Sequence, residues 1–218
     1  MHVCMYLLLL SVAQKSKSTE IQFDFEDFDF TTKSAWTDLQ LKVEDKTLWV
    51  PKSFLIVVSP VFRRMFESDF KERKTVELPL PGKKYEDVLE FLKCTITAAL
   101  TYDIVLQVLP LAHEYQVKRL LMECKYFLLR ELDSTAKSYV KDSYDTRKAK
   151  DYVIKYSKIC VMADKYGFSL LIEKCVKALS FVNCNYYKDL PDFHKISKDV
   201  QNKILLGRLT QVEKKCGF

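Results

Sequence analysis

The sequence has little glycine and lacks any glycine-rich phosphate-binding motif. Only four of the 218 residues are glycine, and neither GxGxxG nor GxxxxGK[ST] occurs. Such loops need glycine because the backbone must approach the phosphate closely. The chain is therefore not expected to hold a nucleotide in this way, and no cofactor is predicted.

Metal-site and catalytic patterns are also absent from the sequence. Seven cysteines are spread between Cys4 and Cys216, never in CxxC spacing, and the three histidines lie far apart. Zinc sites need closely spaced ligands, and no Ser/His/Asp or Cys/His constellation can be assembled. We therefore predict no metal site, no catalytic residue and no enzyme. An odd number of unpaired thiols is typical of a cytosolic or nuclear protein.

The charges do not form a one-sided basic surface. There are 35 basic and 29 acidic residues, a formal charge of +6, and they are mostly interleaved. The densest basic stretch, 136–158, still contains three aspartates. This mixture is typical of a solvated surface, so no nucleic-acid partner is predicted.

The longest apolar run stands at the N-terminus, from Val3 to Val12. It is too short to span a bilayer, and no lysine or arginine precedes it. Three interpretations are open: a short packed segment, the stub of a longer or misassigned N-terminus, and a cleaved signal. No membrane partner is predicted.

One sequence pattern occurs twice, and the two copies align without a gap at a constant offset of 51 residues. AHEYQVKRLLMECKYFL (112–128) aligns with ADKYGFSLLIEKCVKAL (163–179). In each copy the apolar positions have helical spacing. With the apolar helices upstream, 104–113 and 151–165, each copy predicts an αα-hairpin that buries one face only by stacking on a neighbour. The repeated Cys124 and Cys175 are interpreted as small buried hydrophobes.

The N-terminal half predicts strands and short helices. IQFDFEDFDF alternates phenylalanine with acids, as in an exposed strand or a partner-binding arm, and DLQLKVED and TLWV predict a hairpin with its turn at Asp45-Lys46. Pro51 and Ser59-Pro60 each begin a short helix, 76–82 is a third strand, and 85–96 is a helix. Asp103 is expected to cap the 104–113 helix, Pro110 to kink or shorten it, and Ser197 to cap the final helix.

The predicted fold class is α+β: a strand and helix unit of about 100 residues followed by an all-α extension. The stretches DLQLKVEDKTLWVPKSFLIVVSPVFRRMFESDFKE, VELPLPGKKYEDVLEFL and VLQVLPLAHEYQVKRLLMECKYFLL resemble a BTB (POZ) domain, most closely that of MATH-BTB proteins. The helices after it resemble the BACK or three-box extension. The resemblance implies an N-terminal arm (1–35), a BTB domain (36–131), a charged linker (132–150) and a helical extension (151–218).

Two stretches depart from the family pattern. Pro51-Lys52 stands where the family commonly has His before Lys, and CTITAALTYD replaces the usual element after the 85–96 helix. No MATH, Kelch, zinc-finger or ankyrin module is visible in the sequence. The part that normally chooses a substrate is therefore missing or unrecognised.

The resemblance implies two contact surfaces. BTB domains dimerise through the N-terminal arm and the first helix after the hairpin, which by position would include Phe23, Phe30 and Phe54. The alternative is that the arm packs on its own sheet. Many members bind cullin-3 through a hydrophobic-x-Glu element, here Phe70-Lys71-Glu72.

Met65 and Tyr115 are further cullin-binding candidates by family position. The alternatives are that Met65 is a core residue and that Tyr115, expected to be exposed at a turn, only caps the hairpin.

Two functions follow from the resemblance. The first is a dimeric adaptor that links a cullin-3 ubiquitin ligase to an unknown substrate protein. The second is a self-association or scaffold module, forming homodimers or heterodimers with other BTB proteins and lacking ligase activity.

Overall fold

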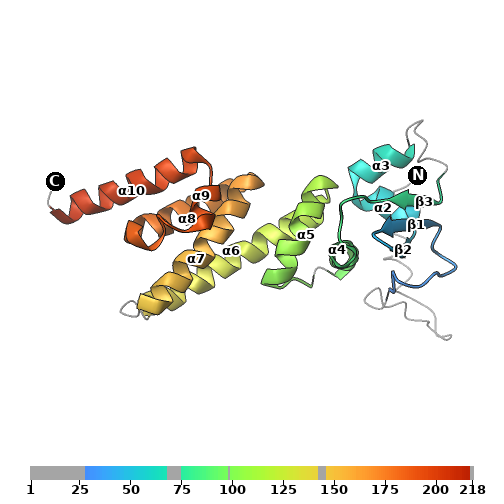
Figure 1. The fold of residues 1–218 in the computed structure, drawn as a ribbon, viewed down its shortest axis with the longest axis horizontal. Coiled ribbons are helices and arrows are strands. Elements are labelled where there is room, and N and C mark those ends of the chain that lie inside the picture. Colours follow the sequence, from blue (N-terminus) through green and yellow to red (C-terminus); the bar gives the residue numbers. More distant parts are fainter. Residues whose placement is uncertain (1–27, 68–74, 98, 142–145, 217–218) are drawn as a thin grey trace, which may run out of the picture.

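The computed structural model describes residues 28–67, 75–97, 99–141 and 146–216. Figure 1 shows an elongated arrangement, with a small sheet near one end and helices continuing to the other. The candidates Phe23, Phe70 and Glu72, and the apolar run 3–12, lie outside the described residues.

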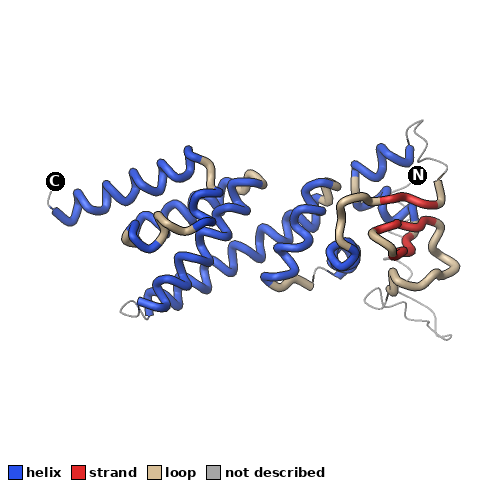
Figure 2. The backbone as a smooth tube through the Cα atoms, viewed as in Figure 1, coloured by secondary structure: helices blue, strands red, loops and turns tan. Residues whose placement is uncertain are grey.

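A mixed three-stranded sheet forms at the N-terminal end of the described chain, drawn in red in Figure 2. Strand β1 (Leu39–Val43) lies in the middle, antiparallel to β2 (Lys46–Val50) and parallel to β3 (Glu77–Pro79). Alternate β1 side chains are buried, as expected for a sheet with one covered face. The hairpin and the third strand are therefore confirmed, with the turn at Glu44 and Asp45.

Two short helices follow the hairpin, as predicted. Helix α2 (Lys52–Val58) begins directly after Pro51, and α3 (Pro60–Glu67) begins directly after Ser59. The backbone N–H of Phe62 donates to the Ser59 hydroxyl at 3.1 Å, so Ser59 caps α3. Helix α4 (Tyr85–Thr97) matches the predicted 85–96 helix and presents Val88, Phe91 and Leu92 to the core.

The described end of the N-terminal arm packs on the sheet of its own chain. The Trp49 N–H donates to the Phe30 carbonyl at 2.7 Å. The Phe30 ring is buried, 4.8 Å from the Phe28 ring and 6.3 Å from the Phe54 ring. For Phe30, the intramolecular alternative therefore describes the structure, because core packing leaves this ring little surface for a partner.

The repeated pattern forms two αα-hairpins: α5 (Tyr102–Glu114) with α6 (Lys118–Lys141), and α7 (Thr146–Lys165) with α8 (Ser169–Phe181). Most stripe positions are buried in both copies: Ala112, Leu120, Cys124 and Leu128, and their equivalents Ala163, Leu171, Cys175 and Leu179. Both turns also share one backbone geometry: the Val117 N–H donates to the Ala112 carbonyl at 2.9 Å, and the Phe168 N–H to the Ala163 carbonyl at 2.8 Å. This is the six-to-one bond of a Schellman helix end. The repeat is therefore architectural.

The residue at the centre of each turn lies in the left-handed region, with φ of 53° at Gln116 and 70° at Gly167. We expect Gly167→Ala to lower the free energy of unfolding by about 1 kcal/mol, because a Cβ is strained at this φ. No atom lies within 4 Å of the added Cβ, so a steric clash would not explain the loss. The matched variant, Gln116→Gly, should stay within about 0.5 kcal/mol of the parent, because strain relief offsets added backbone entropy. Urea denaturation measures both; an unchanged Gly167→Ala variant would contradict the explanation.

The structure corrects one predicted helix cap and shows the backbone at Pro110 and at residues 132–141. Thr101, not Asp103, caps α5, because its hydroxyl accepts the Ile104 N–H at 3.3 Å. Pro110 lies inside α5 without ending it, on the exposed face where water can solvate the freed carbonyl. Residues 132–141, expected to be part of a linker, continue α6. At the final helix, the Ser197 hydroxyl donates to Asp164 at 3.0 Å.

The second hairpin stacks on the first. The Tyr156 hydroxyl on α7 donates to the Leu132 carbonyl on α6 at 2.9 Å, and Lys155 and Glu131 form an ion pair at 2.6 Å. Beyond α8, the short helix α9 (Pro191–Lys195) leads into α10 (Lys198–Cys216). Helix α10 packs closely on α8, because a Cβ added at Gly207 would lie 3.0 Å from the Ser180 Cβ. The hairpins thus bury each other's faces, as the repeat requires.

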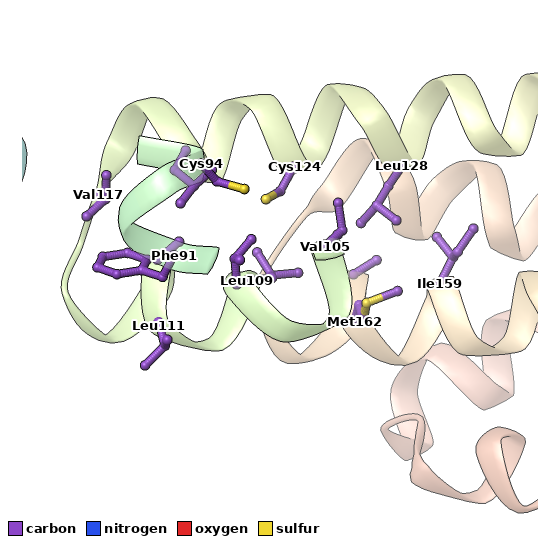
Figure 3. Close-up of a cluster of buried hydrophobic side chains, with 14 of the residues drawn as sticks. Phe91, Cys94, Val105, Leu109, Leu111, Val117, Cys124, Leu128, Ile159 and Met162 are labelled. Atoms are coloured by element: carbon purple, nitrogen blue, oxygen red, sulfur yellow. The ribbon is translucent and has the colours of Figure 1, made fainter. Parts of the chain in front are cut away.

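Buried cysteines fill part of the helical core. In Figure 3 the sulfur atoms of Cys94, on α4, and Cys124, on α6, point toward one another among apolar side chains. Burial raises the pKa of Cys94 to about 11 and that of Cys124 to about 12. A hydrogen bond with Cys160, followed by burial, raises the pKa of Cys175. These thiols stay neutral at physiological pH and pack as small hydrophobes.

Candidate interaction surfaces

The outer side of α3 carries Met65, one of the predicted contact residues. Its side chain is half-buried and packs against the core, while the neighbouring Arg63 and Arg64 are exposed. The Arg63 Nε donates to the Ile56 carbonyl on α2 at 3.1 Å, which ties the two helices together. Met65 therefore contacts the core and keeps part of its side-chain surface accessible. It lies two residues before α3 ends at Glu67.

Tyr115 lies in the core instead of being exposed at the turn. Only 6% of its surface is accessible, and its ring stacks on Phe62 with the centroids 4.4 Å apart. Burial raises the pKa of the Tyr115 hydroxyl to about 12. Its backbone carbonyl accepts the Ser59 hydroxyl at 2.5 Å. Tyr115 is therefore a core residue, whereas both the partner-contact and the capping interpretation assumed an exposed ring.

A third group of apolar side chains lies around α2. Phe54 is half-buried against Phe30, whereas Val57 is 49% exposed. The position of α2 is set by Lys52, whose N–H donates to Asp38 at 2.6 Å and whose Nζ donates to the Thr75 carbonyl at 2.8 Å. These bonds anchor the start of the helix to segments beside β1 and β3. Helix α2 thus presents partly exposed apolar side chains on a rigid support, an arrangement that suits protein contact.

Residues 28–132 match the family model of the BTB/POZ domain. They are a BTB/POZ domain. The match begins in the part of the chain that was expected to be an arm, and it includes Phe28 and Phe30. This agrees with the geometry, since Phe30 belongs to the core of the domain. The match ends within α6, and the described residues after it form helices, in agreement with the predicted all-α extension. The BACK or three-box resemblance of this extension stays a prediction.

The chain is also similar to curated proteins, two of which carry BTB in their names. The chain is 30% identical to BTB and MATH domain-containing protein 38 of Caenorhabditis elegans over 80% of this chain and 41% of that protein. It is 30% identical to Kelch-like protein 38 of Danio rerio, over 54% of this chain and 22% of that protein. Rho-related BTB domain-containing protein 3 of Homo sapiens is 28% identical over 48% of this chain and 18% of its own length. The chain thus spans less than half of each relative, and the similarity supports a protein-interaction role.

The structure also exposes apolar residues that the sequence interpretation did not assign to a surface. On the BTB domain, Trp36 is 70% exposed, and Leu106 on α5 and Met122 and Tyr126 on α6 are exposed too. Outside the matched segment, α10 exposes Leu205, Leu206, Leu209 and Val212. The spacing of Met122 and Tyr126, four residues apart and outside the repeated stripe, was the signal available in the sequence.

Neither a metal cluster nor a spanning helix is found among residues whose placement is described. No three His, Cys, Asp or Glu side chains gather there as metal ligands would. No single described helix is long and apolar enough to cross a membrane. Helices α4 and α5 together reach the length and apolar composition of a span, but they are bent by 94° relative to one another. Both helices bury apolar side chains in the core of the BTB domain.

Proposed function

We propose that the protein is a dimeric BTB adaptor that binds cullin-3 and recruits a substrate protein for ubiquitination. The observation that supports it most is the position of α3 in the BTB domain. This helix carries the half-buried Met65 and ends at Glu67, three positions before Phe70-Lys71-Glu72 in the sequence. An aromatic anchor beside a charged residue is a common arrangement in interface hot spots.

The proposal separates two contacts on one domain. Dimerisation is assigned to the neighbourhood of α2, where Phe54 and Val57 keep accessible apolar surface. Cullin binding is assigned to the end of α3 and the residues that follow it. Because α2 and α3 are held together by the Arg63 bond to Ile56, both contacts would be presented by one rigid unit. A BTB dimer would then offer two cullin sites.

The deciding experiment is calorimetric titration of the full chain with the N-terminal region of cullin-3. We expect the parent to bind and a Phe70→Ala, Glu72→Ala double variant to lose at least about thirty-fold in affinity, corresponding to a hot-spot loss of about 2 kcal/mol. The matched control removes another aromatic and glutamate pair, Tyr126→Ala with Glu123→Ala on the exposed face of α6. Circular dichroism confirms that every variant is folded.

Each outcome separates the candidate functions. Retained binding by the control with loss in the double variant supports the adaptor and the assigned surface. Equal losses in both variants would contradict placement of the contact at Phe70 and Glu72. No binding by the folded parent would contradict the adaptor and favour the second candidate, a self-association or scaffold module without ligase activity.

A further inference from the structure

Helix α10 has apolar residues on two sides, and only one side is covered. The covered side contains Val200 and Ile204, and Gly207 lies against Ser180 of α8. Gln201 fixes the start of this side, because its amide donates to the carbonyls of Phe193 at 3.1 Å and Ile196 at 2.7 Å. The helix is therefore already formed and anchored without a partner.

The uncovered side has the spacing of a coiled coil. Its residues follow one another at intervals of three, four, three and four positions, and all are exposed; they are Asn202, Leu205, Leu209, Val212 and Cys216, and we call them the α10 seam. Alternating intervals of three and four place residues at the a and d positions of a heptad. The contacts of α10 with Ser180 of α8 and with Phe193 of α9 lie on the other side of the helix and do not use this second stripe.

We propose that the α10 seam pairs with the same seam of a second copy of this chain as a short parallel coiled coil. The charges beside the seam favour a parallel pair. In a parallel coil, a g residue faces the e residue five positions later on the partner helix. Arg208 occupies a g position and Glu213 the following e position, which favours two symmetric ion pairs in a parallel coil. The Arg208 guanidinium also donates to the Phe181 carbonyl at 3.2 Å, which holds it beside the seam. An antiparallel pair would bring like-charged flanks together.

Two residues of the α10 seam, Asn202 and Cys216, favour an in-register alignment of the two helices. Asn202 occupies an a position, where a single asparagine in the seam is a known determinant of register and of the two-stranded state. Cys216 occupies an a position at the other end, so a parallel in-register pair places the two thiols against each other. Leu206, at an e position and 63% exposed, would cover the flank of the seam. Because the helix is preformed, pairing costs little ordering entropy.

The contact lies outside the matched BTB segment and does not depend on cullin binding. Figure 1 shows α10 running over α8 to the C-terminal end, at the opposite end of the molecule from the sheet. The α10 seam is thus a second association surface, separate from the dimer contact proposed at α2. Its test can therefore fail while the adaptor proposal stands, and the reverse also holds.

The test uses cross-linking of the full chain with a short bismaleimide. We expect the parent to give a covalent dimer joined at Cys216, identified by peptide mass spectrometry and absent from a Cys216→Ser variant. On the Cys216→Ser background, Asn202→Cys should restore the dimer, because a parallel pair keeps equivalent residues adjacent. In an antiparallel pair centred on Leu209, the two copies of residue 202 would lie about 21 Å apart along the axis, and this variant would not cross-link.

Point variants show whether the seam drives the contact. Leu209 is 53% exposed, so Leu209→Glu should leave the fold intact while the cross-linked dimer falls at least tenfold. The matched control is Thr210→Glu, which adds the same charge on an exposed position of α10 outside the seam and should cross-link like the parent. The proposal is overturned if the parent gives no Cys216 dimer, as expected for a seam covered by a different protein. It is equally overturned if Leu209→Glu cross-links undiminished.

Discussion

The variant Phe62→Ala is expected to lose about 3–5 kcal/mol of unfolding free energy, the cost of emptying a well-packed aromatic site. The ring is buried, stacks on Tyr115 at 4.4 Å and lies 6.1 Å from the Phe66 ring. Truncation would leave a cavity where α3 meets the α5–α6 turn, and the stacking contribution would be lost as well. Urea denaturation followed by circular dichroism measures the loss.

The comparison for Phe62→Ala is Arg64→Ala on the same helix. Arg64 is exposed, so its removal should change the unfolding free energy by no more than about 0.5 kcal/mol. A Phe62→Ala variant within 1 kcal/mol of the parent would show that the junction is not well packed, or that neighbouring side chains collapse into the vacated space. Comparable slopes against urea concentration would confirm that both variants unfold from the same native state.

Ser59→Ala is expected to cost about 2–4 kcal/mol, because one hydroxyl serves two buried groups. It accepts the Phe62 N–H at 3.1 Å and donates to the Tyr115 carbonyl at 2.5 Å. Alanine would remove the cap of α3 and leave the Tyr115 carbonyl without this donor in a region closed to water. The same denaturation measurement applies.

Ser53→Ala provides the control for the loss of a hydroxyl. Ser53 is exposed on α2, where water replaces any bond that it makes. Its removal should change stability by less than about 0.5 kcal/mol. A loss of less than about 0.5 kcal/mol in Ser59→Ala would contradict this prediction. It would show that leaving the Tyr115 carbonyl without its hydroxyl donor has no large desolvation cost.

Local patterns predicted most secondary elements correctly. The hairpin, the short third strand and the Ser59 cap follow from alternation and turn chemistry, which operate over a few neighbouring residues. Both αα-hairpins follow from the apolar spacing of the repeated segment. Helix bounds were less well predicted: the charges of 132–141 suggested a linker, but α6 continues through them because this composition is also compatible with a solvated helix face.

The candidate contact residues divide according to what surrounds them. Met65 and Phe54 keep some accessible surface, whereas Phe30 and Tyr115 are taken into the core. Phe23, Phe70 and Glu72 lie outside the described residues, so their roles remain predictions. The exposed seam of α10 was not assigned to a surface, because leucines at helical spacing equally indicate a core-facing stripe until the neighbours of the helix are known.

By itself, the sequence determined the α+β class, the BTB resemblance and the duplicated hairpin, because these depend on periodicity and local backbone preference. The tertiary structure decided which of two equivalent residues is covered. Tyr115 and Tyr166 occupy the same place in the repeat, yet Tyr115 is buried under Phe62 while Tyr166 is half-buried beside His113. Burial depends on what packs against a helix from distant parts of the chain, and Ser59, 56 residues before Tyr115, supplies the bond that closes this junction.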